Sequence, residues 1–194
     1  ISGLKDGTSL ENMCNELALR KGVKVIGDIK MPLAIPAVDI MEAKEYIFTN
    51  CAPRDNPYDN YITEIGIGKA VRASSSFPAM FCPCEFKNHM FMDGGTLDNI
   101  PIIPLKRMCN KKIMAVNFAA DPVEENSDVM DIIMKTLDIM GNKISEEGIK
   151  QSDFVLTVPT DRAGLFDIEK LDKCYKFGYD TVMENIDEIR KIVN

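Results

Sequence analysis

An acidic side chain followed by two glycines is the feature of this sequence best suited to catalysis. Asp93 ends an apolar run, Met90–Met92, and Gly94 and Gly95 follow it directly. Glycine permits positive φ and lets a ligand or another backbone approach closely, and an acid at the end of a strand can act as a general base in a cleft. Because Asp-Gly is also an ordinary turn signal, the tripeptide alone leaves both interpretations open. We take Asp93 as the candidate base, and Gly94 and Gly95 as the residues that shape its site.

Two groups of serines are candidates for the nucleophile that such a base would activate. Ser9 lies in the segment 7–11 (GTSLE), which imitates the first half of a Gly-x-Ser-x-Gly elbow but has Glu where the last glycine belongs. Thr8 and Glu11 have the spacing of a capping box, so helix capping explains this segment. Residues 74–76 are three consecutive serines that follow a predicted helix rather than a strand. We therefore expect them to serve packing near the site.

The chain has one histidine, and its position argues against a Ser-His-Asp triad. His89 lies four residues before Asp93. If both residues lie on one strand, they are about 13 Å apart along it, which is too far for a hydrogen bond. Because a turn is predicted at Lys87-Asn88, we interpret His89 as a surface turn residue.

Two further groups of side chains near Asp93 in the sequence have both a functional and a structural interpretation. Cys82 and Cys84, with His89 nearby, resemble part of a zinc site. A structural zinc site needs four ligands, usually with wider cysteine spacing, and alternating positions on a strand account for both cysteines. We therefore predict no metal ion. Arg72, near the end of a predicted helix, either pairs with an acid or is an ordinary cation at a helix end.

Helices alternate with apolar strands along the chain, as is typical of an α/β protein. Predicted helices cover residues 10–21, 64–72, 104–109, 129–144 and 171–193; predicted strands cover residues 33–38, 46–49, 90–92, 113–118 and 154–158, with another at Phe86; and residues 51–61 form a predicted loop. Pro36 removes a ladder donor, so its strand should lie at an edge or a bulge. Ile113–Phe118 is nearly all apolar, as in a strand buried on both faces of a parallel sheet. We predict a layered helix/sheet/helix fold with a mostly parallel central sheet.

Composition is typical of a globular domain. The 194 residues are 45% hydrophobic and 27% charged, with 12 glycines and 10 prolines, which excludes collagen-like and disordered chains. No apolar run reaches the ~18 to 20 residues of a membrane-spanning helix. A net charge of −7 without a Lys/Arg stripe argues against a nucleic-acid partner. Six cysteines are too few for a disulfide scaffold, so we expect a reducing compartment, the cytoplasm.

The order of motifs between residues 70 and 101 resembles that of the patatin-like phospholipase family. A helix is followed by Arg72-Ala73-Ser74, by Phe77-Pro78, by a Pro-containing strand and a turn, and then by Asp93-Gly94-Gly95 and Asn99-Ile100-Pro101. The resemblance extends along most of the chain, from Gly3 to the C-terminal helix.

This resemblance implies a patatin-like α/β fold and a lipid acyl hydrolase with a serine–aspartate dyad. In such enzymes the serine attacks an ester carbonyl, an acyl-enzyme forms, and the aspartate takes the serine proton without a histidine. Asp93 matches the family's catalytic aspartate. The implied substrate is an acyl-ester lipid, a phospholipid or lysophospholipid, with transient contact to a membrane surface and no cofactor.

The family's serine elbow and glycine-rich oxyanion loop do not occur in this sequence. Both lie upstream of the region that matches Gly3, so we expect residues 1–194 to be the C-terminal part of a single patatin-like domain. The missing N-terminal segment of the same protein is then a partner of this chain, which alone should be inactive.

Two other classes of protein remain as alternatives. One is a patatin-fold interaction module without catalytic activity. The other is a nucleotide-binding α/β domain, although the sequence has neither a G-x-G-x-x-G motif nor a phosphate loop.

Overall fold

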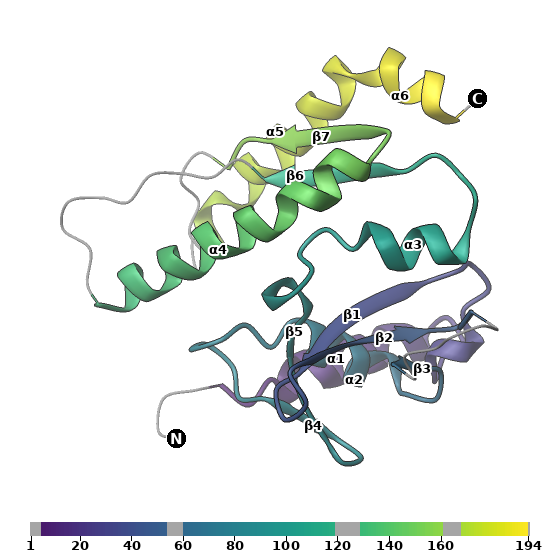
Figure 1. Ribbon diagram of the computed structural model, residues 1–194, viewed down its shortest axis with the longest axis vertical. Helices are drawn as coiled ribbons and strands as arrows, with labels where there is room; N and C mark the ends of the chain where they lie inside the picture. Colours follow the sequence, from purple (N-terminus) through teal and green to yellow (C-terminus); the bar gives the residue numbers. More distant parts are fainter. Residues whose placement is uncertain (1–4, 54–59, 119–128, 161–167, 194) are drawn as a thin grey trace. The chain divides into compact units, whose positions relative to one another are not determined.

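The computed structural model describes residues 5–53, 60–118, 129–160 and 168–193. It divides into two compact units, residues 1–110 and residues 111–194 (Figure 1), which we describe separately as the first and the second unit. The expectation that residues 1–194 belong to a single domain stays a prediction.

The first unit is built around a five-stranded mixed sheet. Its elements are α1 (Thr8–Leu19), the 3-10 helix η1 (Ile26–Asp28), β1 (Ala34–Asp39), β2 (Lys44–Thr49), β3 (Tyr61–Ile62), α2 (Ile67–Ser74), β4 (Cys84–Phe86), β5 (His89–Asp93), the 3-10 helix η2 (Gly94–Thr96) and α3 (Ile102–Met108). The strand order is β3-β2-β1-β5-β4. β1 pairs antiparallel with both β2 and β5, β4 pairs antiparallel with β5, and only β2 and β3 are parallel.

The predicted mostly parallel sheet is therefore wrong for this unit, although the α/β class is confirmed. The physical reason is the length of the connections. Residues 40–43 join β1 to β2, and residues 87–88 join β4 to β5. Connections this short can only produce hairpins, because a parallel crossover needs about a dozen residues or more.

Pro36 lies in the central strand, β1, and not at an edge or a bulge as predicted. Pro36 lies opposite Ile47 of β2. The Ile47 N–H points away from β1 and donates to the carbonyl of Asn60 at 2.8 Å. Pro36 and Ile47 are thus a non-hydrogen-bonded pair, and the backbone of Pro36 faces the β5 side. There β5 ends opposite Ala37, so the missing N–H of the proline costs no ladder bond.

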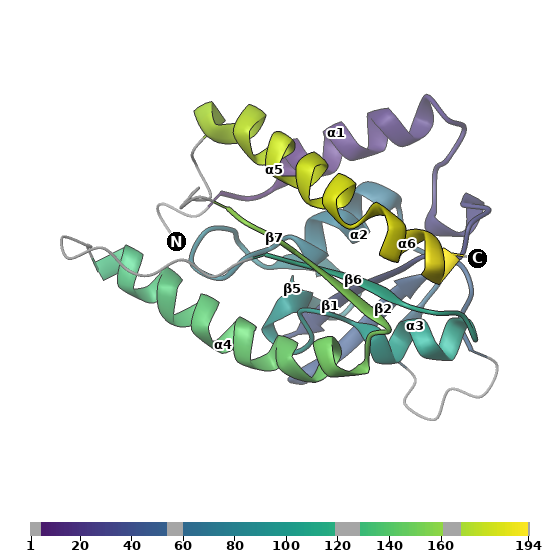
Figure 2. The same cartoon turned by 90° about the horizontal axis from the view of Figure 1, so that it is seen from above.

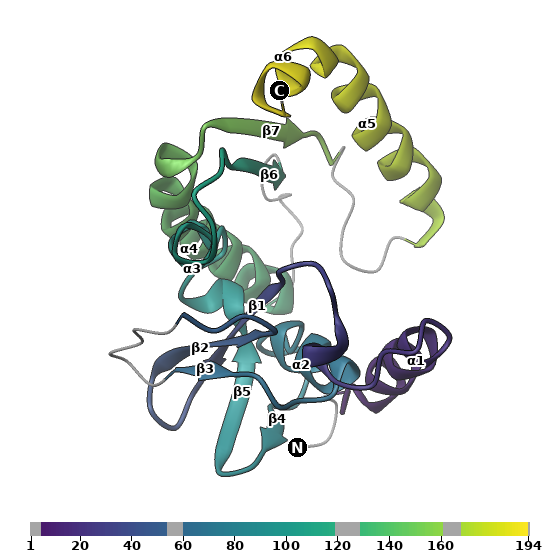
Figure 3. The same cartoon turned by 90° about the vertical axis from the view of Figure 1, so that its right-hand side faces the viewer.

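Both faces of this sheet are buried. One face carries Ala37, Phe48 and Phe91, which pack with Ala70 and Ala73 of α2 in the hydrophobic core. The opposite face carries the buried side chains of Val38, Ile47 and Met92. Ile100, just before α3, and Ile102, the first residue of α3, are buried as well. Helices α2 and α3 lie on opposite sides of the sheet (Figure 3), so this unit has the predicted helix/sheet/helix layering.

α1 packs on α2 through polar side chains and a glycine. The Asn15 side chain accepts the Gly68 N–H at 2.9 Å, and Glu11 forms ion pairs with Lys69 and Arg72 at 3.1 and 3.2 Å. Glu11 therefore faces α2 and does not form the predicted capping box.

The N-terminus of α1 is capped differently from the prediction. The N-cap residue is Gly7, at φ 73°, which has no side chain to accept a hydrogen bond. The side chain of the preceding residue takes this part, since Asp6 Oδ1 accepts the Thr8 N–H at 2.9 Å. Because polar residues of α1 meet α2, Met13 and Leu17 of the apolar stripe remain 52% exposed.

The second unit contains the parallel pair of strands and the C-terminal helices. Its elements are β6 (Met114–Phe118), α4 (Val129–Gln151), β7 (Phe154–Val158), the 3-10 helix η3 (Ile168–Lys170), α5 (Leu171–Glu184) and α6 (Ile186–Val193). β6 and β7 run parallel, and the predicted C-terminal helix is two consecutive helices, α5 and α6 (Figure 2).

β6 is not buried on both faces as predicted. Met114, Val116 and Phe118 are 43–62% exposed, while Ala115 between them is buried. The reason is that, among the described residues, β6 pairs with β7 alone, which leaves this side of β6 only partly covered.

The helices in the described part of the chain include no segment with the length and apolar character of a membrane span.

We predict that Gly68→Ala destabilises the protein, because an added Cβ would clash with the carbonyl oxygen of Glu11 and force α1 away from α2. The expected loss in free energy of unfolding is about 1–3 kcal/mol, measured by urea denaturation. Gly27→Ala is the matched control in the same unit, since its Cβ would come no closer than 4.0 Å to Thr63. Equal stability of the two variants would contradict the close contact.

Candidate active site

Asp93 is the last residue of β5, as the sequence predicts. It lies opposite Ala37 of β1, and its N–H donates to the carbonyl of Ser76 at 3.1 Å. Its side chain caps η2, with Oδ1 accepting the Gly95 N–H at 2.8 Å. The predicted strand end and the predicted turn are both confirmed, because one residue ends the strand and begins the turn; the role of Asp93 as a base stays a prediction.

Gly94 and Gly95 are required by close contacts rather than by positive φ. A Cβ on Gly94 would lie 2.6 Å from the Pro36 carbonyl oxygen. A Cβ on Gly95 would lie 2.8 Å from Asn99 Oδ1 and 3.1 Å from Asp93 Oδ1. Neither glycine is among the described residues with positive φ. Glycine is needed at both positions because the backbone approaches neighbouring atoms closely, and not because it adopts a positive φ.

The carboxylate of Asp93 is half-buried and is not part of a salt bridge with any described residue. Burial raises the pKa of the Asp93 carboxyl above its ordinary value, and the Gly95 N–H offsets part of that rise. Oδ2 has no hydrogen bond to a described side chain. One oxygen is thus held by the backbone, while the other is available to a further donor.

The three consecutive serines pack beside Asp93 but do not bond to its carboxylate. Ser74 ends α2 and Ser75 is its C-cap. Ser76 is 1% exposed, and its hydroxyl donates to the carbonyl of Arg72 at 2.8 Å. These contacts are the packing role that the sequence predicts.

Ser9 lies exposed in the first turn of α1. No strand of the described chain leads into this helix directly. The segment therefore lacks the strand-to-helix turn that exposes an elbow serine.

Arg72 pairs with an acid, which was the first of its two interpretations. Its partner is Glu11 at 3.2 Å rather than Asp93. Arg72 Nε is buried without a hydrogen bond among the described residues. Arg72 consequently ties α2 to α1 and does not pair with the Asp93 carboxylate.

His89 is not a surface turn residue, which corrects the interpretation of the sequence. Its Nδ1 lies 2.7 Å from Oδ2 of Asp39, and the two side chains are only 20% and 1% exposed. The ring packs on Tyr46, with centroids 4.7 Å apart. His89 begins β5 whereas Asp93 ends it, so the expectation that the two do not pair is confirmed. Asp39 is 50 residues away in the chain, and no local pattern connects it to His89.

The cysteines do not form a zinc site with His89. Cys84 is fully buried in the core, and burial raises the pKa of its thiol. Within the described residues, the one group of three or more metal-ligating side chains that lie close together consists of Asp39, Glu42 and His89. Cys82 and Cys84 are not members of this group.

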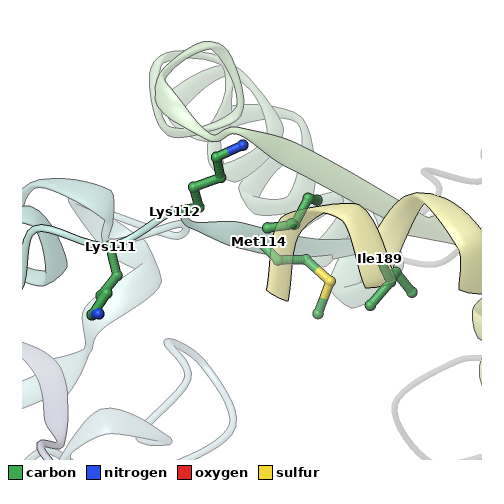
Figure 4. Close-up of a pocket in the computed structure, with 5 residues that line it drawn as sticks. Lys111, Lys112, Met114 and Ile189 are labelled. Carbon is green, nitrogen blue, oxygen red and sulfur yellow. The ribbon is translucent and has the colours of Figure 1, made fainter. Parts of the chain in front are cut away.

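A cavity of about 250 Å³ lies in the second unit, and none of the residues of the predicted site lines it. Lys111, Lys112 and Met114 line it together with Ile189 and Ile192 of α6. The two lysine side chains extend in different directions (Figure 4). Because its charged groups do not converge, this cavity has no arrangement suited to catalysis.

Glu45 is a half-buried carboxylate that was not predicted from the sequence. It lies on β2 opposite Val38, and its Oε1 is buried without a hydrogen bond among the described residues. Burial, the nearby charge of Asp98 and the opposing charge of Arg107 together raise the pKa of Glu45 to about 7, with burial as the largest cause. The signal that could have found it is an acidic residue two positions before Ile47, on the same face of a predicted strand.

Comparison with known proteins identifies the family. The family model described as patatin-like phospholipase matches residues 2–106, which include Asp93 and nearly all of the first unit. The chain belongs to the patatin-like phospholipase family.

Individual relatives are more distant. Lysophospholipase NTE1 of Lodderomyces elongisporus is 27% identical over 135 residues, covering 56% of this chain and 9% of the relative. The protein of the same name from Candida albicans is 26% identical over 135 residues, covering 56% and 10%. The uncharacterized protein YqhO of Bacillus subtilis is 28% identical over 122 residues, covering 60% and 41%. The chain thus spans less than half the length of each of these relatives.

We predict that Glu45→Gln stabilises the protein at pH 8 but not at pH 4. A carboxyl whose pKa rises from 4.5 in the unfolded chain to about 7 in the fold favours folding only while it is protonated, so its destabilising effect grows as pH rises between these values. The expected gain at pH 8 is about 1 kcal/mol, less than the full shift implies because the side chain keeps some contact with water.

Urea denaturation at both pH values measures this difference. Glu85→Gln, which removes an exposed carboxylate from β4, is the control for the change in net charge. A gain at pH 4 as large as that at pH 8 would show that titration of Glu45 is not its cause.

Proposed function

We propose that this chain supplies the general base of a lipid ester hydrolase that uses a serine–aspartate dyad. The observation that carries the proposal is the environment of Asp93. Its carboxylate ends a strand in the family's Asp-Gly-Gly motif, is half-buried, and has no cation partner among the described residues. A carboxylate placed in this way can accept a proton from a substrate or a nucleophile.

In the proposed mechanism a serine on the preceding segment of the same protein is the nucleophile. Its Oγ bonds to the ester carbonyl carbon while its proton passes to Asp93. The protonated Asp93 then gives this proton to the leaving alcohol as the carbon–oxygen bond of the ester breaks. Water then attacks the carbonyl carbon of the acyl-enzyme and gives a proton to Asp93. As the bond between this carbon and serine Oγ breaks, Asp93 passes the proton to Oγ, which releases the fatty acid and restores the free serine and the Asp93 carboxylate. No cofactor takes part in these steps.

The physical properties of Asp93 suit this role. An ordinary carboxylate is a weak base toward a hydroxyl group, and partial burial raises its basicity. The Gly95 N–H holds Oδ1, which leaves Oδ2 for the serine hydroxyl. Gly94 and Gly95 allow the backbone after Asp93 to turn tightly, because without side chains they can lie close to Pro36 and Asn99.

The proposed substrate is a phospholipid or a lysophospholipid at a membrane surface. Two of the relatives are named lysophospholipases, and the family is described as phospholipase. The six cysteines are unpaired, which supports a reducing compartment such as the cytoplasm.

We predict that the protein hydrolyses a lysophospholipid only when this chain is joined to its serine-bearing segment, and that Asp93→Asn then lowers kcat/KM by about 10³-fold or more. Asn keeps the shape and the bond to Gly95 but cannot accept the serine proton. Asp98→Asn is the matched control, because Asp98 is a partly buried carboxylate of the same loop whose pKa is also raised by burial. Normal turnover by a folded Asp93→Asn variant would refute the proposal.

A serine-directed fluorophosphonate probe separates this hydrolase from an inactive module of the same fold. The joined protein should be labelled covalently at one serine, because the active-site hydroxyl is nucleophilic. Labelling should be much slower in Asp93→Asn and unchanged in Asp98→Asn. A folded wild-type protein that stays unlabelled would favour the interaction module.

A further inference from the structure

Three metal-ligating side chains meet at the end of the first unit's sheet that lies away from Asp93. Asp39 is the last residue of β1, Glu42 lies in the connection to β2, and His89 is the first residue of β5. One ligand atom from each lies within 4.8 Å of the others. Chain segments 50 residues apart thus bring two carboxylates and one imidazole together.

Asp39 is held rigidly. Its Oδ1 accepts the N–H groups of Met41 and Met90 at 3.0 and 3.2 Å, and its Oδ2 faces His89 Nδ1 at 2.7 Å. Three hydrogen-bonding contacts from residues of two chain segments therefore hold this carboxylate in a fixed orientation.

Tyr46 orients the other two members of the group from outside it. Its hydroxyl donates to Oε2 of Glu42 at 2.8 Å, and its ring packs on the ring of His89. Phe91 contacts the His89 ring from the strand itself, with centroids 5.3 Å apart. Outer groups that fix a ligating carboxylate and a ligating imidazole in this manner are a regular feature of metal sites.

The ligand types and the spacing of the group suit a divalent cation. An octahedral ion with bonds of about 2.1 Å needs neighbouring ligand atoms roughly 3 Å apart. His89 Nδ1 and Asp39 Oδ2 lie 2.7 Å apart, so a metal ion would take the place of the proton between them. All three ligand atoms lie within 4.8 Å of one another.

We propose that Asp39, Glu42 and His89 bind a divalent transition-metal ion that accepts oxygen and imidazole ligands, with Mn²⁺ as the probe. Carboxylates suit Mn²⁺, whereas thiolates are ligands for softer ions, so the cysteines do not compete for it. The exposed position of Glu42 leaves the remaining coordination positions to water. The ion would fasten residues 40–43 to β5, which is a structural role separate from the proposed hydrolysis at Asp93.

His89 makes the test specific, because it is the only histidine in the chain. Its ring protons give the only histidine signals in the NMR spectrum, and paramagnetic Mn²⁺ broadens the signals of nuclei close to it. We expect an equimolar amount of Mn²⁺ to broaden the His89 ring signals of the wild-type chain selectively. In Glu42→Gln the same broadening should require a Mn²⁺ concentration at least roughly tenfold higher.

Glu42→Gln tests a ligand without endangering the fold, since Glu42 is exposed in a connection. Glu85→Gln removes an exposed carboxylate from neighbouring β4 and should titrate like the wild type. Equal broadening in wild type and Glu42→Gln, or no broadening in the wild type, would overturn the proposal and leave His89 and Asp39 as a clamp between two strands. Hydrolytic activity does not enter this measurement, so its outcome is independent of the proposed function.

Discussion

The pairing of β1 with β5 is the constraint on which the candidate site depends. Beyond the pair formed by Ala37 and Asp93 the ladder stops, because Pro36 offers no N–H on that side and the Gly94 backbone turns against the Pro36 carbonyl oxygen with no room for a Cβ. Both residues act through a missing group. Pro36 has no N–H that would need a partner on β5, and Gly94 has no Cβ that would clash with the Pro36 carbonyl. Asp93 stands at this end point, and its carboxylate is left at the margin of the core.

Three carboxylates of the same sheet show how surroundings decide what an acid can do. Asp39 is buried among donors, so its pKa lies below its ordinary value. Glu45 has an oxygen buried without a donor, and its pKa rises to about 7. Asp93 lies between these cases, with one backbone donor and a raised pKa. Only Asp93 combines partial burial, an uncommitted oxygen and the motif of the matched family, which is why the proposed chemistry rests on it.

Local signals in the sequence predicted the structure correctly. The place of Asp93 at the end of a strand, the helix that leads into the consecutive serines and the strands around Lys87-Asn88 are confirmed, because each depends on neighbouring residues. The pairing of the strands was predicted wrongly, because it depends on residues far apart in the chain. Alternating helices and strands suggested parallel crossovers, whereas the two short connections of the first unit produce hairpins. His89 looked like a turn residue for the same reason, because its partners Asp39 and Tyr46 become neighbours only when β1, β2 and β5 join.

The sequence by itself determined the family, the position of Asp93 at the end of a strand and the separation of Asp93 from the only histidine. Each of these follows from residue types at short spacing, where backbone geometry leaves few choices. Only the tertiary structure decided that Arg72 pairs with Glu11, that no described residue donates to Glu45 Oε1 and that Asp39, Glu42 and His89 meet. These outcomes depend on strand register and helix packing, in which residues far apart in the chain compete for the same partners, and that competition is settled by the free energy of the whole unit.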